Sequence, residues 1–193
     1  IAATIFEITS ENILKNPVLI SGVGMVNTAI NLTKELCHKQ YDLVINMGVA
    51  GSFTNALRNG DVVEVTQDNF SEIGFEDNFI FRKFTEFNLK TQYSVMPRTS
   101  LEQVCAITVN TVHGNKKSIA EIRDRIDCQI ETMEGASVFK VCEEFNVPCV
   151  QIRAISNKIE LRLTPITFSQ SYFYLDKSSV SHFHHLLNKL NSL

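Results

Sequence analysis

The sequence predicts an α/β fold, a three-layer α/β/α sandwich around a central mixed, largely parallel sheet. Two observations lead to this prediction. Short apolar runs alternate with segments whose apolar residues recur at helical spacing. Glycine-containing or polar motifs follow several apolar runs, as they do at the carboxyl ends of strands where such sheets bind ligands. We expect the 193 residues to form one domain, 1–193.

In the first half of the chain, four apolar runs and one amphipathic segment define the expected elements. They are strands at 1–5, 17–22, 41–47 and 61–66, a helix at 27–38 and a glycine turn at 48–52. The helix is predicted from Leu32 and Leu36 at helical spacing, with Asn27 or Thr28 as its cap. The run before the glycine turn is continuously apolar, which is typical of a strand covered on both faces.

The second half begins with a Phe-rich segment that we interpret as irregular strands and loops. The expected elements are that segment at 67–103, strands at 104–110, 129–133 and 148–155, and helices at 118–125, 135–145 and 180–193. Val138 and Cys142 lie on the inner face of the second of these helices. Phe183 and Leu187 make the last one amphipathic.

Composition excludes several classes of protein. Hydrophobic residues make up 44% and charged residues 20%, a balance that predicts a folded core rather than disorder. The net charge of −3, without a basic stripe, argues against a nucleic-acid partner. No apolar stretch reaches the ~20 residues that a membrane span needs, so no membrane association is expected.

The five cysteines are scattered and odd in number, without a C-x-x-C pair. We therefore expect free thiols, no structural zinc site and a cytoplasmic protein. We also expect no cofactor. The chain begins with Ile1 rather than Met, so we expect that a preceding segment is missing.

Two glycine motifs follow expected strands. Gly22-Val-Gly24 departs from the dinucleotide fingerprint G-x-G-x-x-G because Asn27 occupies the third glycine position, which favours a simple tight turn. The segment from Gly48 to Gly51 either packs or lets backbone groups approach a flat ligand.

Three polar side chains at element ends have a structural and a functional interpretation. Glu134 either stabilises a helix N-terminus or accepts hydrogen bonds from the hydroxyls of a ribose. Arg153, which emerges from a buried strand, should pair with Glu131 or Glu134. Asn157 could be a turn residue.

Histidines offer weaker candidates. His182 and His185 share one side of the last helix, but without an acidic or cysteine partner nearby a solvated face is favoured over a metal site. His113 lies near the end of a strand and is a modest site candidate.

Taken together, the motifs resemble those of the nucleoside phosphorylase and hydrolase family, which acts on N-ribosidic bonds. The motifs that carry the resemblance are Gly22-Val-Gly-Met-Val-Asn-Thr, Asn46-x-Gly-x-Ala-Gly-Ser, Gly60-Asp-Val-Val, Met133-Glu-Gly-Ala and Arg153-Ala-Ile-Ser, in this order. Segments 67–77 and 108–114, together with Ser156-Asn157, are most similar to the branch that hydrolyses futalosine in menaquinone biosynthesis. A methylthioadenosine/adenosylhomocysteine nucleosidase, another purine nucleosidase, or a non-catalytic nucleoside-binding protein are the alternatives.

The resemblance implies two catalytic residues. Glu7 matches the carboxylate that activates the attacking water, and Asn157 matches the residue that faces purine N7 and the 6-substituent. Glu134 matches the carboxylate that grips the ribose hydroxyls. The other substrate-binding residues implied are Met133 against the sugar, Gly48, Val49 and Ala50 beside the nucleoside, Thr111 and Val112 along the base, and Arg153 and Ser156 at the strand end.

Asn157 favours a 6-oxopurine. Its amide can donate to O6 and accept from protonated N7, whereas an ionised Asp would oppose O6 with a second acceptor at a cost of ~1–3 kcal/mol when buried. The glycine motifs carry no Arg with which to hold a phosphate dianion, so water is the better nucleophile.

The resemblance also implies a homodimer or a higher homo-oligomer, with the Phe-rich segment as a candidate contact. The chain departs from the family in two places. The stretch between Glu7 and Pro17 is shorter than expected, and residues 163–177 match no family motif.

Overall fold

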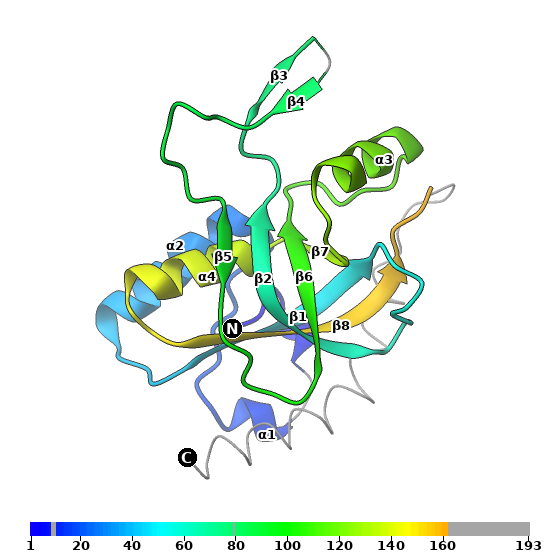
Figure 1. Ribbon diagram of the computed structural model, residues 1–193. Helices are drawn as coiled ribbons and strands as arrows, with labels where there is room; N and C mark the ends of the chain where they lie inside the picture. Colours follow the sequence, from blue (N-terminus) through cyan, green and yellow to red (C-terminus); the bar gives the residue numbers. More distant parts are fainter. Residues whose placement is uncertain (9–10, 79, 162–193) are drawn as a thin grey trace.

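A computed structural model describes residues 1–8, 11–78 and 80–161 (Figure 1). The strands within these ranges are β1 (Val44–Ser52), β2 (Val62–Phe70), β3 (Phe75–Asp77), β4 (Ile80–Arg82), β5 (Gln92–Ser94), β6 (Glu102–Thr108), β7 (Ile130–Thr132) and β8 (Cys149–Lys158). The helices are η1 (Ile5–Glu7, a 3₁₀-helix), α1 (Glu11–Leu14), α2 (Met25–His38), α3 (Lys116–Arg125) and α4 (Gly135–Glu144).

The central sheet is mixed, as the sequence predicts, with strand order β5-β2-β6-β7-β1-β8. The pairs β1–β8, β2–β6 and β6–β7 are parallel, whereas β1–β7 and β2–β5 are antiparallel. Strand β2 also pairs with β8 in antiparallel fashion, so the sheet curves round and closes on itself. Hydrophobic periodicity does not predict this closure, because it depends on how strands far apart in sequence meet.

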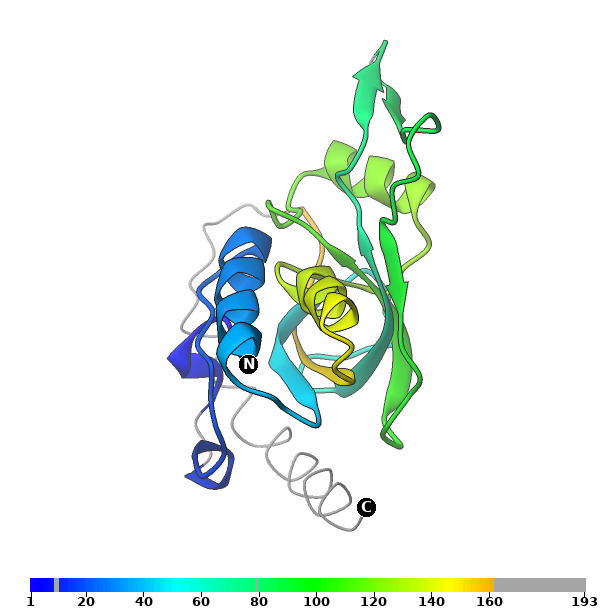
Figure 2. The same ribbon diagram turned by 90° about the vertical axis from the view of Figure 1, so that its left-hand side faces the viewer.

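Helices α2 and α4 lie side by side against the curved sheet (Figure 2). Helix α4 is buried because its inner face consists of small and apolar residues, among them Ala136, Val138 and Phe139. Leu32 and Leu36 of α2 join the same core, as their helical spacing predicts. The core therefore fixes the N-terminal ends of both helices beside the end of β7.

Several predicted boundaries are wrong. Residues 1–5 and 17–22 are not strands, and only an isolated parallel bridge joins Ala2 to Ile20. Helix α2 starts at Met25 with Gly24 as its cap residue, because the Thr28 hydroxyl is buried against Ser21 Oγ at 3.2 Å and is unavailable for capping.

The glycine segment 48–52 is part of β1 rather than a turn. It stays extended because β7 and β8 both offer ladder partners to it. The pairing with β8 shifts between Ala50 and Gly51, so that Asn157 rather than Ser156 lies opposite Gly51. Such a shift re-aims side chains at the end of a strand pair.

The prediction that all cysteines are free is also wrong, because Cys105 and Cys128 form a disulfide. Cys105 is in β6 and Cys128 lies just before β7. The parallel pairing of these strands brings the two Cα atoms to 4.8 Å although 23 residues separate them in sequence. The other cysteines are free thiols.

Two sequence predictions lie outside the described residues: the closing helix at 180–193 and the cluster of His182, His184 and His185. Among the residues that are described, no helix has the length and apolar character needed to cross a membrane.

A buried polar network lies beneath the first turn of α4. Asp68 of β2 is fully buried and accepts hydrogen bonds from Thr108 Oγ1 (2.8 Å) and Gln151 Nε2 (3.0 Å). Thr108 Oγ1 in turn accepts the Ala136 N–H at 2.8 Å. Thr132 Oγ1 similarly accepts the Gly135 N–H at 3.2 Å. The network satisfies donors that a helix N-terminus leaves without partners.

Asp68→Asn tests the electrostatic cost of this network. Burial raises the pKa of Asp68 from 3.8 to about 6, although its hydrogen bonds and Arg153 lower it. The folded protein therefore binds the proton more tightly, and stability is lost as pH rises through about 6. We expect the unfolding free energy of wild type to fall relative to that of the variant between pH 4 and pH 7, by on the order of 3 kcal/mol.

The measurement is denaturant unfolding at both pH values, with Asp42→Asn as the exposed control. A difference between wild type and Asp68→Asn that does not change with pH would contradict the expected cost.

Candidate active site

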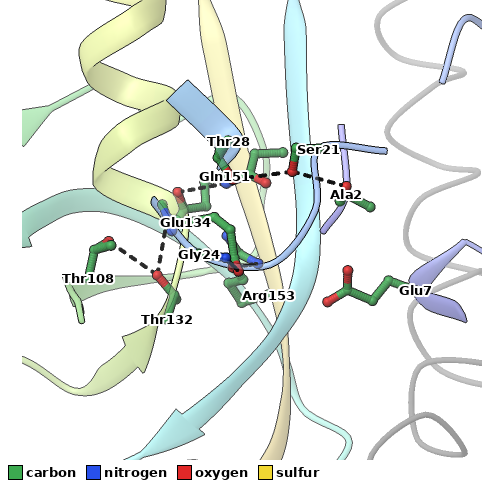
Figure 3. Close-up of polar contacts among 12 residues, drawn as sticks. Ala2, Glu7, Ser21, Gly24, Thr28, Thr108, Thr132, Glu134, Gln151 and Arg153 are labelled. Atoms are coloured by element: carbon green, nitrogen blue, oxygen red, sulfur yellow. Dashed lines mark hydrogen bonds and ion pairs between the residues drawn. The ribbon is translucent and has the colours of Figure 1, made fainter. Parts of the chain in front are cut away.

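Glu134 is held at the N-terminus of α4 by the loop before α2. It is the cap residue of α4, and its side chain is nearly buried. Its Oε1 accepts the backbone N–H of Gly24 at 3.0 Å (Figure 3). Gly22 and Gly24 have φ angles of 80° and 90°, which favour glycine. The Gly22-Val-Gly24 motif is thus the tight turn that the sequence favours, and its N–H orients a carboxylate.

Arg153 of β8 lies beside Glu134. The side chain is 1% exposed, and its Nη1 is 3.9 Å from Glu134 Oε2. The pairing partner is therefore Glu134 and not Glu131. Its Nε and Nη2 are buried and make no hydrogen bond within the described residues. Because buried donors normally find partners, these atoms are the best-placed donors for a bound molecule.

Glu7 approaches the same group from the opposite side (Figure 3). It ends η1, is 8% exposed, and its Oε2 accepts the Thr4 N–H at 2.9 Å. Gly48 of β1 lies directly between the two side chains. A Cβ atom built on Gly48 would lie 2.3 Å from Arg153 Nη1 and 2.9 Å from Glu7 Oε1. The glycine is therefore required by the approach of both side chains.

The electrostatics of Glu7 suit a proton acceptor. Burial raises the pKa of its carboxyl group above the usual 4.5, and the charge of Glu134 raises it further. The Thr4 N–H and Arg153 oppose this shift. A carboxylate whose pKa is raised binds a proton more tightly and is a stronger general base.

Asn157 lies at the end of β8, opposite Gly51. Its Oδ1 accepts from Ser156 Oγ at 2.8 Å, and its Nδ2 donates to the Lys158 carbonyl at 3.0 Å. Ser156 Oγ also lies 3.2 Å from the carbonyl oxygen of Ala50. These contacts fix the amide and leave one N–H and one oxygen lone pair for another molecule.

The site therefore has two parts along β1. Glu7, Arg153 and Glu134 gather at Gly48, and Asn157 lies at Gly51, about 10 Å further along the strand. No hydrogen bond or ion pair joins the two parts within the described ranges of the chain.

The remaining predicted residues surround these two parts. Met133 is half-buried next to Glu134, and Val49 and Ala50 lie in β1 between the two parts. Thr111 and Val112 follow β6. Thr111 is exposed, whereas Val112 packs against the cluster that contains Ile107, Val109 and Ile122.

The sequence analysis missed two features of the site. The first is the hydrogen bond from the Gly24 N–H to Glu134, because the sequence motif indicates only a turn at Gly24. The second is the pairing of His113 with Glu131, whose Nδ1 and Oε2 atoms are 2.6 Å apart. Local sequence patterns could not have revealed this pair, because the two residues are 18 positions apart and helix α3 lies between them.

Comparison with known proteins places the chain in a family. The sequence pattern of the phosphorylase superfamily matches residues 6–170. The methylthioadenosine/S-adenosylhomocysteine nucleosidase of Bacillus subtilis is 30% identical over 177 residues, which are 84% of this chain and 74% of that protein. The Bacillus cytotoxicus nucleosidase of the same name is 28% identical over 91% of this chain and 80% of its own. The chain belongs to the phosphorylase superfamily, and these relatives are nucleosidases.

A third relative is an uncharacterized protein of Acanthamoeba polyphaga mimivirus, which is 26% identical over 68% of this chain. This chain spans about half (53%) of the length of that protein. Solved structures support the fold. A Helicobacter pylori methylthioadenosine/S-adenosylhomocysteine nucleosidase superposes with a TM-score of 0.78 over all of this chain and 96% of that one, at 19% identity. The futalosine hydrolase of Helicobacter pylori gives the same TM-score, identity and coverage.

Gly48→Ala tests whether the two carboxylates and Arg153 depend on the bare backbone at this position. The new Cβ would displace the Arg153 and Glu7 side chains. We expect glycosidic hydrolysis to fall by more than about 100-fold and stability by about 1–3 kcal/mol. Steady-state kinetics and thermal unfolding measure the two effects.

Gly60→Ala is the matched control. Gly60 has φ 93° but open space around it, so alanine there is strained without touching the site. It should lose stability and keep activity. Equal activities of Gly48→Ala and Gly60→Ala would refute the steric role of Gly48.

Proposed function

We propose that this member of the phosphorylase superfamily hydrolyses the N-glycosidic bond of a purine nucleoside, with water as the nucleophile. The observation that supports it best is the convergence of two buried carboxylates and one guanidinium at Gly48. Its nucleosidase relatives favour the same reaction class.

The charge at this part of the site matches the transition state. Breaking a glycosidic bond gives the sugar oxocarbenium character, so positive charge develops beside the ring. Glu7 and Glu134 outnumber Arg153 and leave a net negative charge where that cation forms. The same two carboxylates repel a phosphate dianion, which favours hydrolysis over phosphorolysis.

Each side chain then has a defined task. Glu134 keeps acceptor positions beyond its Gly24 contact, and these can accept the 2′- and 3′-hydroxyls of ribose. Glu7 takes a proton from the attacking water as the C1′–O bond forms. Arg153 can orient that water through Nε or Nη2, which lack partners in the described structure.

Activity should decline at low pH, because Glu7 cannot accept a proton from water once it is protonated. Since the pKa of Glu7 is raised, this decline should begin at a higher pH than for an ordinary glutamate.

Within this reaction class we propose a 6-oxopurine nucleoside, futalosine, as the substrate, giving dehypoxanthine futalosine and hypoxanthine for menaquinone biosynthesis. Asn157 supports this choice. Its Nδ2 donates a hydrogen bond to the Lys158 carbonyl, which fixes the orientation of the amide. An Asp there would place an oxygen against that carbonyl as well as against O6. A nucleoside laid along β1 would place its sugar near Gly48 and its base near Gly51.

The second candidate is cleavage of methylthioadenosine or S-adenosylhomocysteine, the substrates for which the Bacillus relatives are named. It requires a 6-aminopurine at Asn157.

We also propose a cytoplasmic homo-oligomer. Phe75, Ile80 and Phe87, which are exposed on and near the β3–β4 hairpin that projects from the sheet (Figure 1), form an apolar surface that a second copy could cover.

A substrate screen separates the two candidates. The protein is incubated with futalosine, inosine and methylthioadenosine, each with and without phosphate, and the released base is identified by chromatography. We expect hypoxanthine from futalosine at a rate independent of phosphate. Asn157→Asp should lower this rate and raise adenine release, because the carboxyl group accepts from a 6-amino group. Preferential adenine release by the wild type would favour the second candidate.

Glu7→Gln tests the general base. The amide cannot take the proton of water, so kcat should fall by about 10²–10⁴-fold, while the dissociation constant for a product or substrate analogue changes less than about 3-fold. Glu11→Gln, an exposed change in the neighbouring helix, is the control and should be silent. Rapid hydrolysis by Glu7→Gln would remove this residue from the mechanism.

A further inference from the structure

Asn157, the described residue that we expect to face N7 of the purine, is not an acid. A purine that leaves as an anion gains electron density in its ring, and protonation at N7 relieves it. Asn157 can donate a hydrogen bond through its amide, but an amide does not give up its proton. This inference rests on the proposed hydrolysis and asks which group supplies the proton to the leaving base.

His113 and Glu131 form a dyad near that end. His113 Nδ1 lies 2.6 Å from Glu131 Oε2, and the backbone N–H of His113 donates to Glu131 Oε1 at 3.0 Å. The Glu131 side chain is 1% exposed and that of His113 is 12% exposed. A carboxylate at Nδ1 fixes the orientation of the ring, so that Nε2 is the nitrogen that can exchange a proton with another molecule.

Strand register places this dyad beside the base end. Gly51 of β1 is the partner of Glu131 in β7 and also of Asn157 in β8. Residues directly opposite one another in a sheet point to the same face, and neighbouring strands are about 4.8 Å apart. Glu131 and Asn157 therefore flank Gly51, with roughly 10 Å between their backbones. The side chains of Ile159 and Asn157 pack over Gly51, where a Cβ atom would lie 2.8 Å from Ile159 Cγ1 and 3.4 Å from Asn157 Nδ2.

The outer edge of the imidazole is open. Nε2 of His113 makes no hydrogen bond to any residue that the structure describes, and it is not among the buried polar atoms without a partner. The ring of Phe53, just after β1, is next to the imidazole, with centroids 6.2 Å apart and planes tilted by 59°. The ring is thus braced by Glu131 and Phe53 while one nitrogen remains accessible.

We propose that His113 is the general acid that protonates the leaving purine, with Glu131 as its positioning residue. As the C1′–N9 bond breaks, its electron pair moves into the purine, and the proton on His113 Nε2 transfers to N7. Glu7 takes a proton from the attacking water, whose oxygen bonds to C1′. Afterwards Glu7 loses its proton to solvent and His113 regains one, so that water and nucleoside give the free sugar and the neutral base.

The leaving group provides the test. His113→Gln should reduce kcat for the best purine nucleoside found in the screen by about 10²–10⁴-fold, the range of a lost general acid. 4-Nitrophenyl β-ribofuranoside has a leaving group that needs no proton, so its hydrolysis should change less than about 3-fold. Glu131→Gln keeps an acceptor for the His113 N–H but removes the charge, and it should show a smaller loss in the same pattern.

His38→Gln, which changes an exposed histidine at the end of α2, is the control for a histidine substitution. Equal losses with both substrates in His113→Gln would assign a structural role to the dyad and overturn the proposal. Unchanged purine hydrolysis in His113→Gln would overturn it too. Because each comparison uses wild-type hydrolysis as its reference, a failure of the proposed function would appear separately, as no hydrolysis of either substrate by wild type.

Discussion

The absence of a side chain at Gly48 is the constraint on which the site depends. It lets Arg153 Nη1 and Glu7 Oε1 come together over the backbone of β1, with Glu134 on the far side of the guanidinium. A buried guanidinium is costly without a partner, and two nearby carboxylates compensate its charge. They overcompensate it, which leaves the region negative, and two N–H groups of Arg153 stay without partners in the described structure. A site built in this way is complementary to a cationic sugar and a polar nucleophile.

The scaffold around this site holds Glu134 in position. Thr108 and Thr132 accept the first free N–H groups of α4, and buried Asp68 fixes Thr108 from below. Gly24 supplies the contact from the side. A carboxylate at a helix N-terminus is itself favourable, because it faces the positive end of the helix dipole. The network costs stability through the charge on Asp68 and contributes a fixed geometry for the cap residue.

Local patterns predicted most elements and the members of the site, but not their contacts. Leu32 and Leu36 identified the face of α2, and the resemblance carried by Met133-Glu134-Gly135-Ala136 pointed to Glu134, which the structure places beside Arg153. Segment 48–52 was mistaken for a turn, since glycine favours turns locally while β7 and β8 hold it extended. The disulfide and the pairing of His113 with Glu131 depend on strands meeting in space. No local sequence motif corresponds to either pair.

The central claim is that the region around Gly48 stabilises positive charge on the sugar. The most direct measurement compares the dissociation constants of two 9-deazahypoxanthine ligands, one with a protonated pyrrolidine in place of ribose and one with a neutral carbocycle of the same shape. Tighter binding of the cation by more than about 100-fold, and its loss in Glu134→Gln, is the result that this electrostatic arrangement predicts. Equal affinity for the two ligands would contradict it.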